Sequence, residues 1–325
     1  MISDEKLFMI AVAYYANGRH QQDIANELGV SHVQIGKYLK MARQKGIVEI
    51  SINPPYVDAS EQKRQSMVFR SVFGLENLVL VPTAASLEQA RAFLVKGAAK
   101  YIISEFENKA TRIGVGMGQT MFRLAGIRVS YADRRNSWKF YPVMNYYDQK
   151  MHSSEDHSDY FNYQDMIDAF LKNWGGRTDK TFMESFGSNM MRPAVEDQDI
   201  EKELLSRYWS KLDLIIGGVG VPFPRDPIAR IAMFGEKKAS ELEGMDIMGD
   251  YLNYHFDSEG RVLEPSVLSK NRIRWEDIQR IPQRIAIAGG PSKVPGIIGL
   301  LRAKGVNTLI TDVMTAKSIL EYNNL

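Results

Sequence analysis

The stretch QQDIANELGVSHVQIGKYLK, residues 21–40, predicts two short helices around a tight turn. Ile24 and Leu28 are apolar and four residues apart, so they share one face of the first helix. Gly29 follows, where glycine allows the left-handed backbone of a sharp turn. Ser31 then stands at the N-cap of a second helix. This pattern is typical of a helix-turn-helix, whose second helix enters the major groove of DNA.

The second helix also carries the charge that DNA binding requires. Residues 31–47 hold four cations and no acid, and phosphate neutralisation by such residues supplies much of the affinity for DNA. Lys37 and Lys40 fall on the helix side away from Ile35, which is apolar. An ordinary helical hairpin with a solvated basic face is the alternative. We expect DNA contacts from Ser31, His32, Val33, Gln34, Gly36, Lys37 and Lys40.

The composition limits the class of protein. A chain of 325 residues should form about two domains, at roughly 150 residues each. Its net charge of +2 is small, so any charge that binds DNA must be local. It has no cysteine, which excludes disulfides and thiol nucleophiles. No stretch approaches the roughly 20 apolar residues of a membrane span, and the apolar run 7–16 lacks the basic start of a signal peptide. We expect a cytoplasmic protein with no membrane partner.

Two prolines mark the boundary between the domains. The run 7–16 should form the first helix of the N-terminal domain, and residues 47–52 a short extended segment after the basic helix. Asn53-Pro54-Pro55 cannot continue a helix and reads as a linker. The predicted organisation is a DNA-binding domain over residues 1–53, a linker over 54–60 and a second domain over 61–325.

The second domain predicts an α/β fold with a mostly parallel sheet, because strands and helices alternate along it. The expected strands are 78–81, 112–115, 212–216, 284–288 and 308–311, and the expected helices are 60–73, 86–107, 118–124 and 294–303, the last closed by Gly305. The tyrosine-rich stretch 130–176 gives no clear assignment. Ligands bind outside the carboxyl ends of the strands in such sheets, and three of these strand ends carry glycines.

Two glycine-rich turns could hold an anion. In GVGMGQTM, residues 114–121, Gly116 and Gly118 would expose backbone N–H groups at the start of a helix, and Thr120 would add a hydroxyl. The spacing does not match a dinucleotide fingerprint. In AGGPSK, residues 288–293, Lys293 would lie near the same anion. Tight turns with nothing bound, and a solvated lysine, are the alternatives.

Two polar stretches remain open to more than one interpretation. Asp250, in GDYLNYHFDSEG, could accept hydrogen bonds from sugar hydroxyls or could cap a turn. HSSEDHSD, residues 152–159, contains metal-ligating residue types, but its two histidines are five apart and do not align on a helix. We interpret it as a solvated loop and expect no metal and no cofactor.

Taken together, these motifs resemble the sorbitol-operon regulator family of bacterial transcription factors (SorC/DeoR type). The family includes central glycolytic gene regulators and deoxyribonucleoside regulators. The resemblance rests on YYANGRHQQDIANELGVSHVQIGKYLKMARQKGIVEI, followed in order by IGVGMGQTM, DLIIGGVG, GDYLNYHFDSEGRVL and IAIAGGPSKVPGIIGLLRAKGVNTLITD. It implies a C-terminal domain similar to glucosamine-6-phosphate deaminases and ribose-5-phosphate isomerases. It also implies a sugar phosphate or related sugar as effector, and a homodimer or homotetramer held together by this domain.

The resemblance also implies an effector site. The residues at matching positions are Gly116, Met117, Gly118, Gln119, Thr120, Gly218, Asp250, Gly290 and Lys293. The sequence departs from the family pattern where the strand 139–143 leads into residues 144–147, where a glycine-containing loop is common. Met117 replaces a common tryptophan, and His255 replaces a usual aromatic residue. An unphosphorylated sugar therefore stays open as the effector.

The resemblance thus predicts a DNA-binding transcriptional regulator of a carbohydrate-metabolism operon, with operator DNA and a small sugar or sugar phosphate as partners. The alternative is a sugar-phosphate isomerase-like or deaminase-like enzyme, which would need a carboxylate base and often a histidine. Asp250 and His255 are the nearest such pair, but their odd spacing would place them on opposite faces of one strand. We therefore expect no catalytic residues.

Overall fold

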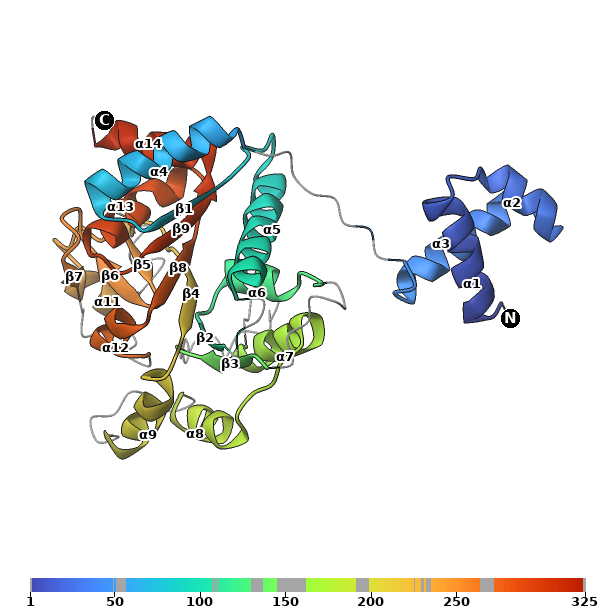
Figure 1. The fold of residues 1–325 in the computed structure, drawn as a ribbon. Coiled ribbons are helices and arrows are strands. Elements are labelled where there is room, and N and C mark those ends of the chain that lie inside the picture. The colour runs from blue at the N-terminus through green and yellow to red at the C-terminus, as the bar shows by residue number, and fades with distance from the viewer. Residues whose placement is uncertain are drawn as a thin grey trace. The chain divides into compact units, whose positions relative to one another are not determined.

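The computed structural model describes residues 2–48, 50, 57–106, 109, 111–129, 137–144, 162–190, 199–224, 226–228, 231, 235–263 and 272–323 (Figure 1). The chain forms two compact units, Met1–Asn53 and Pro54–Leu325.

The N-terminal unit is a small helical bundle. Its elements are α1 (Asp4–Ala11), the π-helical turn η1 (Val12–Ala16), α2 (Gln21–Leu28) and α3 (His32–Gln44). The first helix starts before the predicted residue 7, because the Ser3 side chain accepts a hydrogen bond from the Lys6 N–H and caps it. The buried residues of this bundle are Leu7, Ile10, Ala11, Ile24, Ala25, Ile35, Leu39 and Ala42.

The turn between α2 and α3 has the predicted geometry. Gly29 is left-handed, with φ at +64°, and the Ser31 Oγ accepts a hydrogen bond of 3.2 Å from the Gln34 N–H. The prediction that Leu28 lies with Ile24 on the apolar face of α2 is wrong, because Leu28 is 40% exposed. Because α2 ends at this residue, Val30 in the turn packs against the core instead.

The expected extended segment after α3 does not pair as a strand where the structure describes it. The backbone N–H groups of Ile47 and Val48 both donate to the Ala42 carbonyl, at 2.9 and 3.2 Å. These bonds fold the chain back onto the end of α3, where both side chains pack on the buried Ala42. Ile52 lies outside the described residues.

The C-terminal unit is built on a six-stranded sheet in which every neighbouring pair of strands is parallel. The strand order is β1-β9-β8-β4-β2-β3. The strands are β1 (Asn77–Val81), β2 (Arg112–Val115), β3 (Lys139–Pro142), β4 (Leu214–Gly218), β8 (Gln283–Ile287) and β9 (Thr308–Asp312). The predicted α/β class is confirmed.

Helices cover both faces of this sheet (Figure 1). The described helices of this unit are α4 (Ala59–Phe73), α5 (Leu87–Phe106), α6 (Gln119–Ala125), α7 (Tyr163–Trp174), α8 (Lys180–Met190), α9 (Asp199–Trp209), α11 (Glu236–Glu241), α12 (Trp275–Arg280), α13 (Val294–Arg302) and α14 (Val313–Tyr322), with a 3₁₀ turn η3 (Pro291–Lys293). Figure 1 shows α5, α6 and α7 on one face, and α13 and α14 on the other. The unassigned stretch 130–176 contributes β3 and α7.

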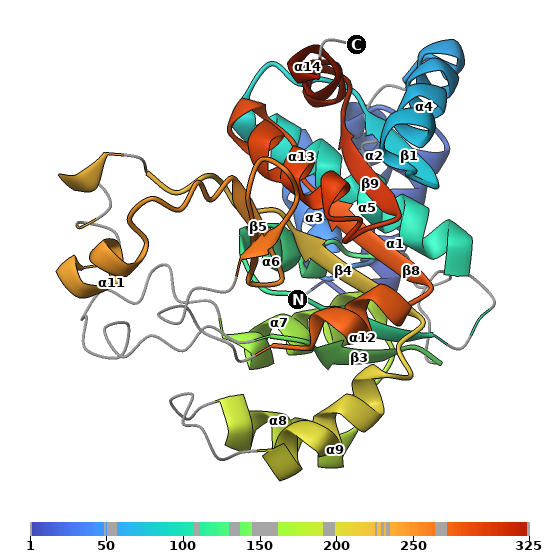
Figure 2. The same cartoon turned by 90° about the vertical axis from the view of Figure 1, so that its left-hand side faces the viewer.

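A second, antiparallel sheet lies beside α13 (Figure 2). It consists of β5 (Gly249–Tyr251), β6 (Tyr254–Phe256) and β7 (Val262–Leu263). Leu252 and Asn253 form the two-residue turn between β5 and β6, and both have positive φ, at 51° and 64°. Such angles at both positions are those of a type I′ hairpin turn, and they are costly for leucine.

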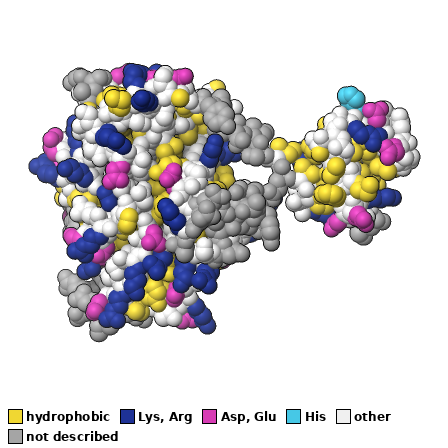
Figure 3. All heavy atoms as spheres, in the orientation of Figure 1, with side chains coloured by type: hydrophobic (Ala, Val, Ile, Leu, Met, Phe, Trp, Pro, Cys, Tyr) yellow, Lys and Arg dark blue, Asp and Glu magenta, His cyan; other side chains and the backbone are white. Residues whose placement is uncertain are grey.

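The surface gives two further observations. Within the described ranges, no helix combines the length and the apolarity that crossing a membrane demands. Hydrophobic side chains gather on one face of the N-terminal unit (Figure 3), and on α1 Phe8 and Met9 are more than half exposed.

We expect that Ala25→Leu destabilises the N-terminal unit by about 1–3 kcal/mol, because Ala25 is fully buried between the helices and added methylenes overpack such a site. Hydrogen exchange of the amides of α2 and α3 measures the loss. Tryptophan fluorescence checks the other unit independently, because all four tryptophans lie in it: Trp138, Trp174, Trp209 and Trp275.

Ala16→Leu is the matched control, because Ala16 is exposed in the same unit. Equal exchange in the two variants would contradict close packing at Ala25.

Candidate functional site

A cavity of about 350 Å³ opens at the carboxyl ends of β2, β4 and β8. Helices α5 and α6 and the strand β5 complete its wall. Its lining consists of Leu87, Ala90, Arg91, Leu94, Val95, Met117, Gly118, Gln119, Thr120, Arg123, Gly218, Val219, Gly220, Asp250, Ile287, Ala288, Gly289, Gly290, Ser292 and Lys293. This is the edge where ligands bind in parallel α/β sheets.

Lys293 is a cation held in place at the wall of this cavity. Its ammonium donates a hydrogen bond of 2.6 Å to the Val219 carbonyl, so the side chain is anchored across from its own turn. Loss of hydration lowers the pKa of Lys293, whereas the Asp250 carboxylate acts in the opposite direction. An ammonium held in this way has further N–H donors for an anionic or hydroxyl-bearing ligand.

Asp250 is the carboxylate of the cavity. Loss of hydration raises the pKa of Asp250 to about 6, although the Lys293 ammonium and a backbone hydrogen bond from Asn253 oppose the shift. Near neutral pH the group is therefore an ionised hydrogen-bond acceptor that gains a proton under mild acid. Such a carboxylate suits the recognition of hydroxyl groups.

The backbone around Gly220 fixes the position of Asp250. The Gly220 N–H donates to the Asp250 carbonyl at 2.7 Å, and Val219 forms a β-bridge with Tyr251. A Cβ added at Gly220 would lie 1.8 Å from the Asp250 Oδ1. Only glycine fits at position 220. The last glycine of the motif IGGVG, residues 216–220, therefore leaves the space that the Asp250 carboxylate occupies.

Eight of the nine predicted effector residues line the cavity together: Met117, Gly118, Gln119, Thr120, Gly218, Asp250, Gly290 and Lys293. Gly116 does not. Its N–H donates to the Ile216 carbonyl at 2.9 Å, and a Cβ there would meet the Leu252 side chain at 2.5 Å. The expectation of an exposed N–H at Gly116 is therefore wrong, because this glycine makes room for Leu252.

Two arginines of the cavity, Arg91 and Arg123, were not predicted from the sequence. Arg123 lies four residues after Gln119 on α6, so helical spacing could have placed it on the same face. It forms an ion pair of 2.7 Å with Glu88 of α5. Arg91 comes from α5, and no sequence motif connects it to the glycine-rich turns. Among the described lining residues, the cations thus outnumber the acids, with Asp250 as the carboxylate.

The relation between Asp250 and His255 also differs from the sequence prediction. The two residues lie on neighbouring strands and pair directly in the antiparallel register. Directly paired residues share one face of a sheet, so the expectation of opposite faces is wrong. His255 is nevertheless absent from the lining of the cavity. Its ring is buried beside Phe223, at 5.2 Å between ring centroids, and loss of hydration lowers its pKa to about 4.

The exposed side of α3 is the candidate DNA-contacting surface. Ser31, His32, Val33, Lys37 and Lys40 are exposed, and Gln34 and Gly36 are partly buried. A Cβ on Gly36 would contact the Gln21 side chain at 3.4 Å, an ordinary distance.

The histidine-rich stretch 152–159 lies outside the described residues. Over the part of the chain that the structure does describe, no group of three His, Asp or Glu side chains is arranged to hold a metal ion.

A helix-turn-helix unit joined to an α/β unit with a charged ligand cavity defines the class of transcription regulators that respond to a small molecule. The profile of the family described as "Putative sugar-binding domain" matches residues 58–321, which is most of the chain. The chain belongs to this family.

Relatives of known name span almost the whole chain. The sorbitol operon regulator of Klebsiella pneumoniae is 24% identical over 316 residues, which cover 96% of each chain. The deoxyribonucleoside regulator of Bacillus subtilis is 22% identical and covers 94% of each. The crystal structure of full-length SorC from K. pneumoniae has a TM-score of 0.63 at 23% identity, covering 98% of this chain and all of that one. That likeness confirms the fold.

The raised pKa of Asp250 predicts a pH-dependent stability. Between about pH 6 and pH 4 the folded state holds a proton that the unfolded chain has lost, so this residue adds stability as the pH falls. Above pH 6 its buried charge costs roughly 1–3 kcal/mol. Asp250→Asn should therefore raise the free energy of unfolding at pH 7.5 by that order, and the gain should vanish near pH 4. Urea unfolding followed by tryptophan fluorescence measures it.

The difference between variant and wild type is the informative quantity, because His255 contributes the opposite trend. Its lowered pKa makes stability fall as the pH drops from about 6.5 to about 4. Glu243→Gln is the control, because Glu243 is exposed. A pH-independent difference for Asp250→Asn would contradict the assignment.

Proposed function

We propose that this protein is a DNA-binding transcriptional regulator of a carbohydrate-metabolism operon, controlled by a sugar phosphate or a related sugar. The observation that carries the proposal is the cavity in which Asp250 faces the same space as Lys293. Residues 1–53 would bind DNA, and residues 61–325 would bind the effector and join subunits. Residues 54–60 would link the units, with α4 already beginning at Ala59 in the last part of this stretch. The proposed location is the cytoplasm.

The cavity suits a ligand with an anionic end and a hydroxyl-bearing end. Lys293, Arg91 and Arg123 offer N–H donors to an anion. The Asp250 carboxylate offers acceptor oxygens to hydroxyl groups. Gly118 and Gly290, with φ at +111° and +98°, keep the turns free of side chains where a ligand would approach. These features support a phosphorylated sugar over a free one.

Lys293→Met should separate these two ligand types. In a thermal-shift screen of sugar phosphates and free sugars, a ligand at 100 times its Kd should raise the melting temperature by about 5 °C. The variant should lose the shift with phosphorylated ligands, because it removes the ammonium from the cavity. Lys63→Met, at an exposed lysine of α4, is the control.

If Lys293→Met keeps the full shift with the phosphorylated ligand, then the phosphate does not bind beside Lys293. A shift with a free sugar that survives in the variant would identify an unphosphorylated effector.

The proposed DNA contacts lie on α3, with Ser31, His32, Val33, Gln34 and Gly36 beside Lys37 and Lys40. Lys37→Ala combined with Lys40→Ala should weaken binding to a mixed-sequence DNA duplex roughly 10-fold at 0.1 M salt. The plot of log affinity against log salt should become shallower by about two ions, because each phosphate contact releases about one counterion. Fluorescence anisotropy across a salt series measures both.

Lys6→Ala is the matched control for DNA binding, because Lys6 is an exposed lysine of α1 in the same unit. An unchanged salt slope in the double variant would place the DNA surface elsewhere.

We propose a homodimer or homotetramer as the working form. One helix-turn-helix reads a single half-site, and two copies gain specificity by spanning half-sites about one or more helical turns apart. Light scattering on the full chain at micromolar concentration should give a mass of two or four chains. A monomer that still binds operator DNA with full affinity would contradict this proposal.

A sugar-phosphate isomerase-like or deaminase-like enzyme is the competing proposal, because the cavity holds a carboxylate with a raised pKa. The named relatives are regulators, which agrees with a protein that is not an enzyme. His255, the paired histidine, does not reach the cavity wall. Turnover of a sugar phosphate that is lost in Asp250→Asn would favour the enzyme.

A further inference from the structure

The wall of the cavity is hydrogen-bonded to the first turn of α14. The Gly290 N–H donates to the Thr315 Oγ1 at 2.7 Å. The Thr315 hydroxyl in turn donates to Asp312, and the Thr315 N–H donates to the Asp312 Oδ1 at 2.9 Å, which caps the helix. Thr315 and Asp312 are both buried. Buried polar groups therefore connect Gly290 to the start of α14, and hydrogen bonds between buried groups are strong.

The two glycines of this turn allow the Gly290 peptide to change its orientation. Gly290 has φ at +98°, a region that residues with a side chain rarely adopt. A Cβ on Gly289 would lie 2.6 Å from the Asp312 Oδ2, so the carboxylate packs directly under the turn. In the structure the Gly290 N–H has the Thr315 hydroxyl as its acceptor. A ligand oxygen that replaced this hydroxyl as acceptor would give the turn a second arrangement.

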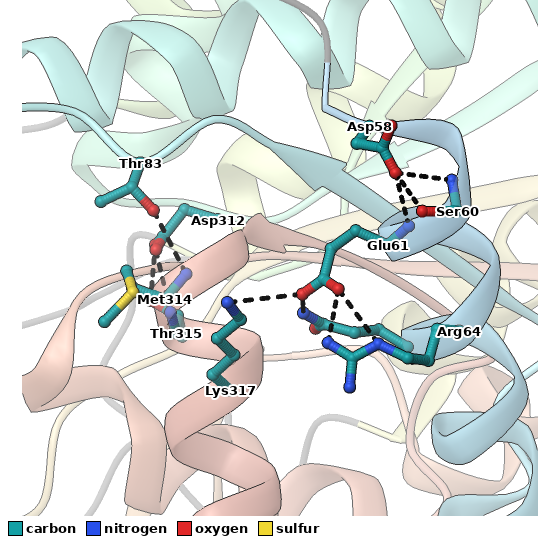
Figure 4. A network of polar contacts seen from close by, with 10 residues as sticks. Asp58, Ser60, Glu61, Arg64, Thr83, Asp312, Met314, Thr315 and Lys317 are labelled. Atoms are coloured by element: carbon teal, nitrogen blue, oxygen red, sulfur yellow. Dashed lines mark hydrogen bonds and ion pairs between the residues drawn. The ribbon is translucent and has the colours of Figure 1, made fainter.

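The same helix is linked to α4 by an ion pair. The Lys317 ammonium lies 3.5 Å from the Glu61 Oε1 (Figure 4). Glu61 also accepts hydrogen bonds from Arg64, at 3.1 Å from its Nε, and from the Gln65 amide, at 2.6 Å. The hydrogen bonds from Arg64 and Gln65 hold the pKa of Glu61 below its ordinary value, so the carboxylate is ionised at neutral pH.

Helix α4 is the first element of the C-terminal unit that the chain enters after the linker. The Asp58 carboxylate caps it by accepting from the Ser60 and Glu61 N–H groups. Gln62 binds α4 to the sheet, because its Oε1 accepts from the Leu80 N–H at 2.9 Å. α4 is therefore the helix of the C-terminal unit that lies nearest in the chain to the DNA-binding unit.

We infer that α14 couples occupancy of the cavity to α4, through Gly290, Thr315 and Asp312 at one end and the ion pair of Lys317 with Glu61 at the other. The inference rests on the proposed role of the cavity as the effector site. A ligand oxygen that takes the Gly290 N–H releases the Thr315 hydroxyl and changes the first turn of α14. A ligand shifts the two arrangements only by its unequal affinity for them, and the coupling therefore needs a group that reaches Gly290.

The first test uses the full chain without ligand and measures hydrogen exchange of the α4 amides. Thr315→Val removes the hydroxyl at nearly constant size, and it should raise exchange in α4 at least 3-fold. Thr315→Ser keeps the hydroxyl and should match the wild type. Lys317→Met should raise α4 exchange as Thr315→Val does, and Lys63→Met, at an exposed lysine of α4, should not.

The amides of α7, on the opposite face of the sheet, report any general loss of stability. A rise in α4 exchange that is matched in α7, or unchanged α4 exchange in Thr315→Val, would overturn the coupling.

The second test adds inorganic phosphate as the probe and follows its binding by calorimetry. The wild type should bind phosphate and change its α4 exchange. Lys317→Met, which leaves the cavity intact, should bind phosphate equally well but show less than one third of that change. An undiminished change in Lys317→Met would overturn the route. Failure of the wild type to bind phosphate would count against the phosphate site instead, and the ligand-free test would still decide the coupling.

Discussion

The candidate site depends on how the tip of the β5–β6 hairpin is seated in the main sheet. Leu252 is buried in a left-handed conformation, and its side chain occupies the space that Cβ atoms on Gly116 and Gly217 would need. The adjacent Tyr251 hydroxyl donates to the Ile285 carbonyl of β8 at 3.0 Å. Because the hairpin is fixed at its tip, Asp250 cannot swing away from the cavity. Gly116 and Gly217, which do not line the cavity, therefore help to fix where the carboxylate lies.

The cavity brings together charged groups that lose hydration in the folded protein. Burial raises the pKa of Asp250 and lowers the pKa of Lys293, so both shifts favour the neutral form. The charge of each residue offsets part of the pKa shift of the other. Such an ion pair contributes little to the free energy of folding, because the loss of hydration cancels much of the attraction between the two charges. The position of this pair in the cavity at the carboxyl ends of the strands suits preorganisation for a ligand. Strain and unfavourable burial commonly gather at functional sites for this reason.

Local sequence signals predicted most elements, and the failures have identifiable physical causes. Apolar periodicity and turn signals placed α2, α3, α4 and the strands β1, β2, β4, β8 and β9, because each signal acts within a few residues. β3 lies in the stretch 130–176, which gave no clear assignment. Leu28 was misjudged because the helix ends before its side chain can turn inward. Gly116 was predicted to help hold an anion, because its packing partner Leu252 lies more than a hundred residues away and local sequence does not show it. Arg91 reaches the cavity only through tertiary structure, and His255 faces Asp250 because a hairpin turn intervenes.

The order of strands has a consequence for how the chain is made. β1 is hydrogen-bonded to β9, so Asn77 cannot pair until Thr308 has been synthesised. During synthesis, more than two hundred residues must leave the ribosome before that pair forms, and pairing over such a separation is slow. The core contacts described for the N-terminal helices join residues within the unit Met1–Asn53, so this unit can fold much earlier. A nascent chain would thus carry a finished helix-turn-helix ahead of the cavity proposed to control it.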